Sequence, residues 1–171
     1  QFFDRVNHDV LMHRLGQETR DKRCLKLIGR MLRAGHILPD GDVVMAEAGT
    51  PQGGPLSPLL ANLYLDELDR ELDRRGLKFC RYADDCNIYV KSRKAGERVL
   101  ENITRYIEEK LKLKVNRNKS AVGRPSKRKF LGLSFYMVKG KARNFIHIKS
   151  IQRFKGKVRL ITSRSNGRSM E

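Results

Sequence analysis

Two adjacent aspartates, Asp84 and Asp85, interrupt the apolar, β-prone stretch FCRYADDCNIYV. Aspartate is poorly suited to a strand interior and a buried charge is costly, so the pair is expected at a tight turn between two strands. Two neighbouring carboxylates resist joint ionisation unless a cation lies between them. Mg²⁺ prefers such oxygen ligands, together with substrate phosphates. The pattern favours a magnesium site, although an ordinary Asp-rich hairpin turn fits the same residues.

The loop GTPQGGPLSP, which begins at Gly49, is a second candidate. Its glycines let a ligand approach the backbone, its prolines stiffen it, and Thr50, Gln52 and Ser57 offer hydrogen-bonding groups. The long helix expected after it presents its amino end to the same place. No Gly-Lys-Ser/Thr follows, so this is not a Walker loop. The loop either contacts a nucleotide or serves as a rigid entry to the helix.

The charge of the chain indicates its class of partner. The sequence has 37 Lys and Arg against 19 Asp and Glu, a net charge of +18. Such a protein repels itself unless a polyanion neutralises it, with nucleic acid the first candidate and an acidic membrane surface the second. Composition alone also fits a generic ribosome-bound or histone-like protein. With no apolar run near the length of a membrane span, about 20 residues, and no secretory signal, a soluble intracellular protein is expected.

The three cysteines, Cys24, Cys80 and Cys86, form no C-x-x-C pair. A zinc site needs about four grouped ligands. The cysteines are therefore interpreted as reduced packing residues.

Apolar periodicity predicts the elements that position these residues. Helices are expected over NHDVLMHRLGQ with Asn7 as cap, over DKRCLKLIGRMLRAG, and over LSPLLANLYLDELDRELDRRG. The third helix has an apolar stripe of Leu56, Leu59, Leu60, Leu63, Leu68 and Leu72. Strands LKFCRY and CNIYVKS flank the aspartates, another helix covers about residues 94–112, and a second hairpin and a basic, initially helical tail follow. This order predicts an α+β fold with an antiparallel sheet.

Four motifs in order carry a resemblance to a known family: GTPQGGPLSPLLANLYLDELD, RYADD, LKVNRNKS and FLGLSF. The chain resembles a reverse transcriptase, and more narrowly the bacterial group II intron-encoded reverse transcriptases, or maturases. The resemblance implies the antiparallel palm sheet of a right-hand polymerase, packed on two long helices. It assigns residues 1–150 to the palm and the basic segment 151–171 to the start of the thumb or maturase region.

The resemblance also implies roles for individual residues. Asp84 and Asp85 would be catalytic ligands of a two-Mg²⁺ site, with Tyr82 shaping the turn. Lys119 would stand near the leaving pyrophosphate as a general acid, or be a solvated loop lysine. The nucleotide- and template-binding positions are Phe3, Gln52, Gly53, Gly54, Pro55 and Tyr82. The primer grip, or alternatively simple core, is Phe130, Leu131 and Gly132.

The amino end departs from the family's pattern. The family motif that carries a third metal-binding aspartate reads Asp, three residues, Phe, Phe, Asp, and QFFD contains only its end. Asp4 matches the second aspartate, which is not the ligand, and a cap or an ion pair near Arg5 is the favoured role. The first aspartate and the fingers are expected upstream. This chain alone is therefore expected to have little or no polymerase activity.

The function implied for the whole protein is an RNA-directed DNA polymerase in the bacterial cytoplasm that also assists group II intron splicing and mobility. Its implied partners are RNA template or intron RNA, a DNA primer and dNTPs. Two alternatives stay open: an RNA-binding splicing cofactor without polymerase activity, and a retron or defence-type reverse transcriptase.

Overall fold

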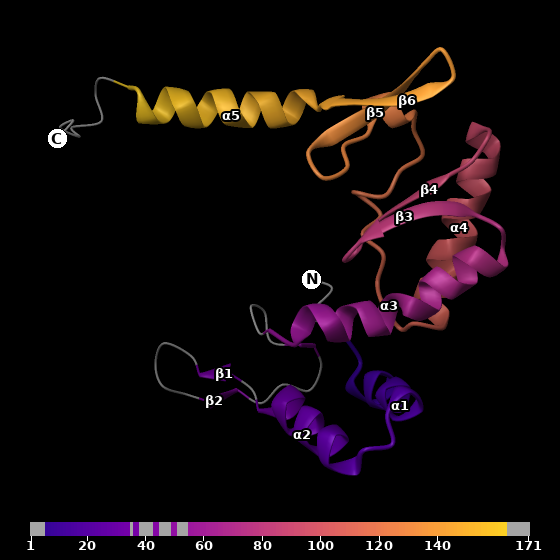
Figure 1. Cartoon of the computed structure of the whole chain (residues 1–171), viewed down its shortest axis with the longest axis vertical. Coiled ribbons are helices and arrows are strands. Elements are labelled where there is room, and N and C mark those ends of the chain that lie inside the picture. Colours follow the sequence, from indigo (N-terminus) through magenta and orange to yellow (C-terminus); the bar gives the residue numbers. More distant parts are fainter. Residues whose placement is uncertain (1–5, 35, 38–42, 45–48, 51–54, 164–171) are drawn as a thin grey trace. The chain divides into compact units, whose positions relative to one another are not determined.

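The computed structural model describes residues 6–34, 36–37, 43–44, 49–50 and 55–163. The chain divides into two compact units, residues 1–122 and residues 123–171, called the first and second unit below. The elements of the first unit are α1 (His8–Glu18), α2 (Lys22–Arg33), β1 (His36–Ile37), β2 (Val43–Val44), α3 (Ser57–Arg74), β3 (Lys78–Tyr82), β4 (Asp85–Tyr89) and α4 (Arg93–Glu109) (Figure 1). Those of the second unit are the 3-10 helix η2 (Pro125–Lys127), β5 (Leu133–Val138), β6 (Lys141–Ile146) and α5 (Ile148–Ile161).

The helices of the first unit begin where the sequence supplies caps. The Asn7 side chain accepts a hydrogen bond from the Val10 amide at 3.0 Å, which confirms the predicted cap of α1. Asp21 accepts from the first amides of α2, and Ser92 accepts from the Ala95 amide of α4. These side chains satisfy amides that have no partner within the helix.

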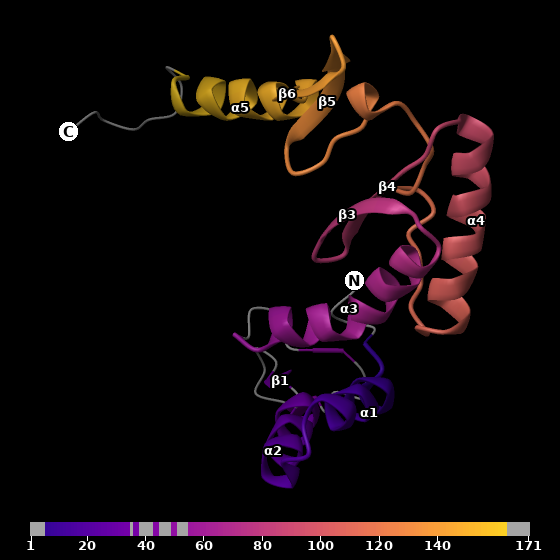
Figure 2. The ribbon, with the colours of Figure 1, turned by 45° about the vertical axis from the view of Figure 1, so that its right-hand side comes forward.

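The core of the first unit forms around α3. Leu11, Tyr64, Leu72 and Leu111 are fully buried there. The stripe predicted for α3 is buried or half-buried except at Leu59, which is 65% exposed, so that part of the prediction is wrong. The hairpin β3–β4 packs on this core through Phe79, Cys86 and Ile88, and Figure 2 shows the hairpin next to α3 and α4. The core therefore fixes the hairpin that carries the aspartates.

The described strands form three separate two-stranded antiparallel sheets, β1–β2, β3–β4 and β5–β6. The mixed helical and antiparallel composition is thus confirmed, and the turn predicted at the two aspartates lies between β3 and β4. The described strands do not, however, join into the single palm sheet that the resemblance implied. The pairings β3–β4 and β5–β6 are local and are set by their own turns, whereas joining hairpins requires long-range pairing that apolar alternation does not specify.

The second unit consists of the hairpin β5–β6 flanked by η2 and α5. Every residue of β6 is exposed and no residue of α5 is buried. Backbone and hydroxyl hydrogen bonds join its parts: the His147 amide and the Ser150 hydroxyl both donate to the Gly132 carbonyl, at 3.0 Å each. The helical start of the basic tail is confirmed. The predicted boundary after residue 150 falls inside this unit and stays a prediction. Among the described helices, none has the length and apolarity to cross a membrane.

Candidate active site at the β3–β4 hairpin

Asp84 and Asp85 lie at the tip of the hairpin β3–β4. The register pairs Tyr82 with Asp85, so Ala83 and Asp84 form a two-residue turn and Asp85 is the first residue of β4. The turn was predicted, and both aspartates are exposed there. Ala83 has a φ of 51°, in the left-handed region that residues with a Cβ seldom occupy. A strained, short turn therefore places both carboxylates at one end of a hairpin.

Neither carboxylate of this turn forms a hydrogen bond or an ion pair within the part of the chain that the structure describes. By contrast, Glu67, Asp69 and Glu71 on α3 each bind an arginine. Two consecutive, exposed, unpaired carboxylates have the oxygen chemistry that Mg²⁺ prefers. The described residues include no cluster of three or more His, Cys, Asp or Glu placed to hold a metal, so the fit is to two protein ligands.

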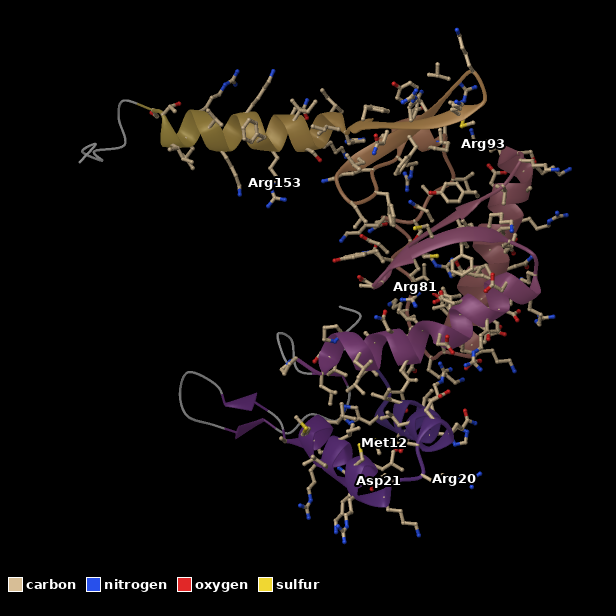
Figure 3. All side chains as sticks on the ribbon, viewed as in Figure 1. Met12, Arg20, Asp21, Arg81, Arg93 and Arg153 are labelled. Carbon is tan, nitrogen blue, oxygen red and sulfur yellow. The ribbon has the colours of Figure 1, made fainter. Side chains whose placement is uncertain are left out.

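Arg81 ties this turn to helix α3. Its side chain is 11% exposed, and its Nε donates to the two carboxylate oxygens of Asp69 at 2.8 and 3.0 Å. Its Nη1 donates to Asn62 Oδ1 at 3.1 Å and to the Ala83 carbonyl at 3.0 Å. Figure 3 shows Arg81 between the hairpin and α3. The hydrogen bonds to Asp69 are the main cause that raises the pKa of Arg81 above its usual range, so the guanidinium stays charged.

The sequence reasoning missed Arg81, although a signal was present. Arg81 stands two residues after Phe79, and alternation places both side chains on the same face of β3. A charged residue on the face that packs against a core needs a partner there. This signal predicts a carboxylate partner on the preceding amphipathic helix, but it does not say which of the carboxylates on that helix the partner is.

The cysteines are free thiols, and two of them are exposed. Cys86 is half-buried behind the turn, and burial is the main cause that raises its pKa to about 11. Cys24 and Cys80 are exposed, so the prediction that all three are packing residues is wrong for these two. Cys80 alternates with Phe79 and Arg81 and therefore lies on the outer face of β3.

The remaining predicted nucleotide-site residues lie on other segments. Lys119 is exposed in a turn, where its amide donates to the Asn116 carbonyl at 3.1 Å. Pro55 is exposed and precedes α3. The beginning of its loop is anchored at the start of α1, because the Gly49 amide donates to the Val6 carbonyl at 2.8 Å and the Gly49 carbonyl lies 2.6 Å from His8 Nε2. Phe3, Asp4, Gln52, Gly53 and Gly54 lie outside the described residues.

The predicted primer grip forms a tight turn in the second unit. Phe130 and Leu133 exchange backbone hydrogen bonds of 2.8 and 2.9 Å across Leu131 and Gly132. Leu131 and Gly132 both have positive φ, 50° and 86°, as in the turns that match the twist of a hairpin. Phe130 is buried and Leu131 is 55% exposed, so the turn presents an apolar side chain to solvent.

The positive charge of the chain is concentrated in the second unit. Of the 37 Lys and Arg and 19 Asp and Glu residues, the second unit holds 14 and 1, which leaves 23 and 18 in the first. Its described residues include no Asp or Glu at all, and their cations are Arg124, Lys127, Arg128, Lys129, Lys139, Lys141, Arg143, Lys149, Arg153, Lys155, Lys157 and Arg159. Such a surface suits a polyanion.

Comparison with known proteins decides the family. The family model described as reverse transcriptase (RNA-dependent DNA polymerase) matches residues 1–135. The chain belongs to this family.

Its relatives include proteins of group II introns. Protein YkfC of Escherichia coli is 32% identical over 71% of this chain and 40% of its own length. The group II intron-encoded protein LtrA of Lactococcus lactis subsp. cremoris is 40% identical over 46% of this chain and 13% of its own length. The chain thus spans less than half of either relative. The predicted resemblance to group II intron-encoded reverse transcriptases is confirmed.

One similarity is to a solved structure. The chain is 33% identical to a chain of the "Partial Cas6-RT-Cas1--Cas2 complex", over 63% of this chain and 20% of the other. The TM-score is 0.37.

Proposed function

We propose that the whole protein copies RNA into DNA and that Asp84 and Asp85 are the metal-binding residues in this chain. Family membership supports the reaction class. The observation that carries the site is the pair of exposed, unpaired carboxylates on a strained hairpin turn, in a protein of net charge +18. The other predicted residues keep their proposed roles around this turn.

Asp84 and Asp85 would hold Mg²⁺ through their carboxylate oxygens, and the structure supports this with two exposed side chains that make no competing ion pair within its described residues. The chemistry supplied by bound Mg²⁺ is neutralisation of charge on the reacting phosphates. Lys119 would stabilise charge on the leaving pyrophosphate. Tyr82, 63% exposed beside the turn, has an accessible ring for contact with nucleotide or template.

The proposed partners are an RNA template or intron RNA, a DNA primer and dNTPs, and the proposed location is the bacterial cytoplasm. The cationic second unit supports contact with phosphate backbones. It also favours a second candidate function, that of a maturase that binds intron RNA to assist splicing. The two functions are compatible, and a protein that splices its intron without synthesising DNA would have the second alone.

Primer extension on an RNA template tests the proposed function. In the whole protein, Asp84→Ala should lower Mg²⁺-dependent DNA synthesis by about a thousandfold or more, since it removes half of the charge of the proposed ligand pair. Asp73→Ala is the matched control, because Asp73 is an exposed carboxylate on α3 and its loss should change synthesis less than about twofold.

RNA affinity and intron splicing, measured on the same two variants, separate the candidates. Asp84→Ala should leave both nearly unchanged. Synthesis that survives Asp84→Ala would contradict the assignment of the site. The 171-residue chain tested alone is expected to give little or no extension, and robust extension by it would contradict the expectation that further residues complete the metal site.

A further inference from the structure

Arg81 supports a turn whose backbone is otherwise disfavoured. Ala83 has a φ of 51° at the first central position of the two-residue turn, where glycine is the usual residue. Such a conformation persists when its surroundings fix it. The only side-chain hydrogen bond that the described residues give to this turn is the one from Arg81 Nη1 to the Ala83 carbonyl, at 3.0 Å.

Helix α3 in turn fixes the guanidinium of Arg81. Asn62 and Asp69 are about two helical turns apart and therefore share a face of α3. Both accept hydrogen bonds from the guanidinium of Arg81, at 3.1 Å for Asn62 and at 2.8 and 3.0 Å for Asp69. Helix α3 is itself anchored by Tyr64 and Leu72, which are both fully buried. The turn is thus connected to the most deeply buried helix of the first unit.

Asp69 has a second effect, which is electrostatic. A guanidinium that reaches the Ala83 carbonyl stands one residue from Asp84, and it is a strong bidentate partner for any carboxylate. Asp69 accepts hydrogen bonds from this guanidinium through both of its carboxylate oxygens. Asp84 and Asp85 therefore stay unpaired in the described part of the chain, beside an arginine that would otherwise bind them.

We propose that Arg81, neutralised by Asp69, is a positioning residue for the active site: it holds the Asp84–Asp85 turn on α3 while leaving both carboxylates available to a divalent cation. The cation part of this inference rests on the proposed function. Two experiments on the 171-residue chain test it, and the second needs no metal.

The first experiment measures Mn²⁺ affinity from paramagnetic broadening of the Asp84 and Asp85 amide signals in NMR spectra. Asp69→Asn should weaken Mn²⁺ binding about tenfold, because the released guanidinium can pair with the turn. Asp66→Asn is the matched control, since it makes the same charge change on α3 but breaks a pair with exposed Arg70, and it should change affinity less than about twofold.

The double variant with Asp69→Asn and Arg81→Gln separates this electrostatic role from a merely structural one. It should recover part of the lost Mn²⁺ affinity, because the competing charge is gone although the link from Arg81 to α3 is lost as well. Equal affinities of the Asp69→Asn and Asp66→Asn variants, or no recovery in the double variant, would overturn the proposal. Far-ultraviolet circular dichroism confirms that each variant is folded.

The second experiment compares Arg81→Lys with Arg70→Lys without metal. A lysine keeps the charge but cannot bond Asp69, Asn62 and Ala83 together. The Asp85 amide should exchange with solvent about tenfold faster in Arg81→Lys, as expected for the loss of charge-assisted hydrogen bonds, and unchanged in Arg70→Lys. Unchanged exchange in both variants would refute the positioning role. Absence of Mn²⁺ broadening in the unmodified chain would instead show that Asp84 and Asp85 do not bind a divalent cation without the residues expected upstream, and it would contradict the cation part of this proposal.

Discussion

The two units use the same residue type for different purposes. In the first unit, arginines such as Arg14 and Arg81 bind carboxylates of α3 and join separate elements. In the described residues of the second unit there is no carboxylate side chain for an arginine to bind. Part of the charge in the first unit is therefore neutralised within the fold, whereas charge in the second unit remains available to a partner. The net charge of a chain says less than where its charges are neutralised.

The two units also differ in how far their apolar side chains are buried. The first unit has a contiguous core around Tyr64 and Leu72, and the second has exposed apolar side chains along α5, among them Phe154 at 67% exposure. A hairpin and a helix that bury so little are marginally stable by themselves. The first unit thus holds the turn rigidly on a core, whereas the second exposes most of its side chains for contact with a partner.

The largest expected effect is the loss of a core side chain. Leu72→Ala, at a fully buried position of α3, should lower the free energy of unfolding by about 2–5 kcal/mol because it leaves a cavity. Phe154→Ala on α5 should change it by less than about 0.5 kcal/mol. Urea unfolding followed by circular dichroism measures both. Equal losses at the two positions would show that α5 has a core of its own.

Alanine substitutions at two helix glycines, one in each unit, should change the free energy of unfolding by intermediate amounts and in opposite directions. A Cβ on Gly96 of α4 would lie 2.7 Å from Val122 Cγ1, so Gly96→Ala should lower the free energy of unfolding by about 1 kcal/mol. A Cβ on Gly156 of α5 would meet nothing within 4 Å. Gly156→Ala should stabilise α5 by about 0.5–1 kcal/mol through helix propensity. Thermal unfolding of both variants tests this, and a gain at Gly96 would contradict the close packing.

The smallest expected effect is pH dependence that is confined to the first unit. Hydrogen bonds from Arg74, followed by the nearby Arg75, lower the pKa of Glu71 from 4.5 to about 2. A carboxyl whose pKa is lower in the folded state stabilises the fold above its unfolded pKa, and this stability is lost as pH falls from 4.5 towards 2. Glu71→Gln should therefore flatten the loss of stability over that range. The exposed Glu101→Gln is the control, and identical acid unfolding curves for Glu71→Gln and the unmodified chain would disprove the coupling.

Local signals made much of this fold predictable. Asn7 as a cap, the turn at Asp84 and the helical start of the basic tail all follow from residues close together in sequence. Burial within a helix was less predictable, because Leu59 belongs to the apolar stripe predicted for α3 and yet is exposed. Periodicity identifies a face of a helix, but only the neighbouring elements decide how much of it they cover.

The same difference between local signals and contacts between distant elements applies to the candidate site. Asp84 and Asp85 were identified because two adjacent charged residues are unexpected within an apolar, β-prone run. The contact between Arg81 and Asp69 was missed because it joins a strand to a helix, and no local pattern specifies that pairing. The absence of Asp and Glu from residue 110 to residue 170 is readable in the sequence, but the division of the chain into two units after Val122 required the structure.

The central claim is that the first unit carries the chemistry and the second unit binds the nucleic acid, and one paired measurement tests it most directly. RNA-templated DNA synthesis and RNA affinity are measured together in the whole protein. Two variants are compared: Asp84→Ala in the first unit, and a triple exchange of Lys155, Lys157 and Arg159 to Gln in the second. An equal exchange of the exposed Arg93, Lys94 and Arg98 on α4 is the control.

We predict that Asp84→Ala abolishes synthesis with RNA affinity unchanged. The α5 triple should lower RNA affinity about tenfold at low salt and flatten its dependence on salt, because fewer phosphate contacts release counterions. The triple exchange on α4 should change RNA affinity and its dependence on salt much less. Synthesis that survives Asp84→Ala, or equal losses of RNA affinity in the two triples, would contradict the account.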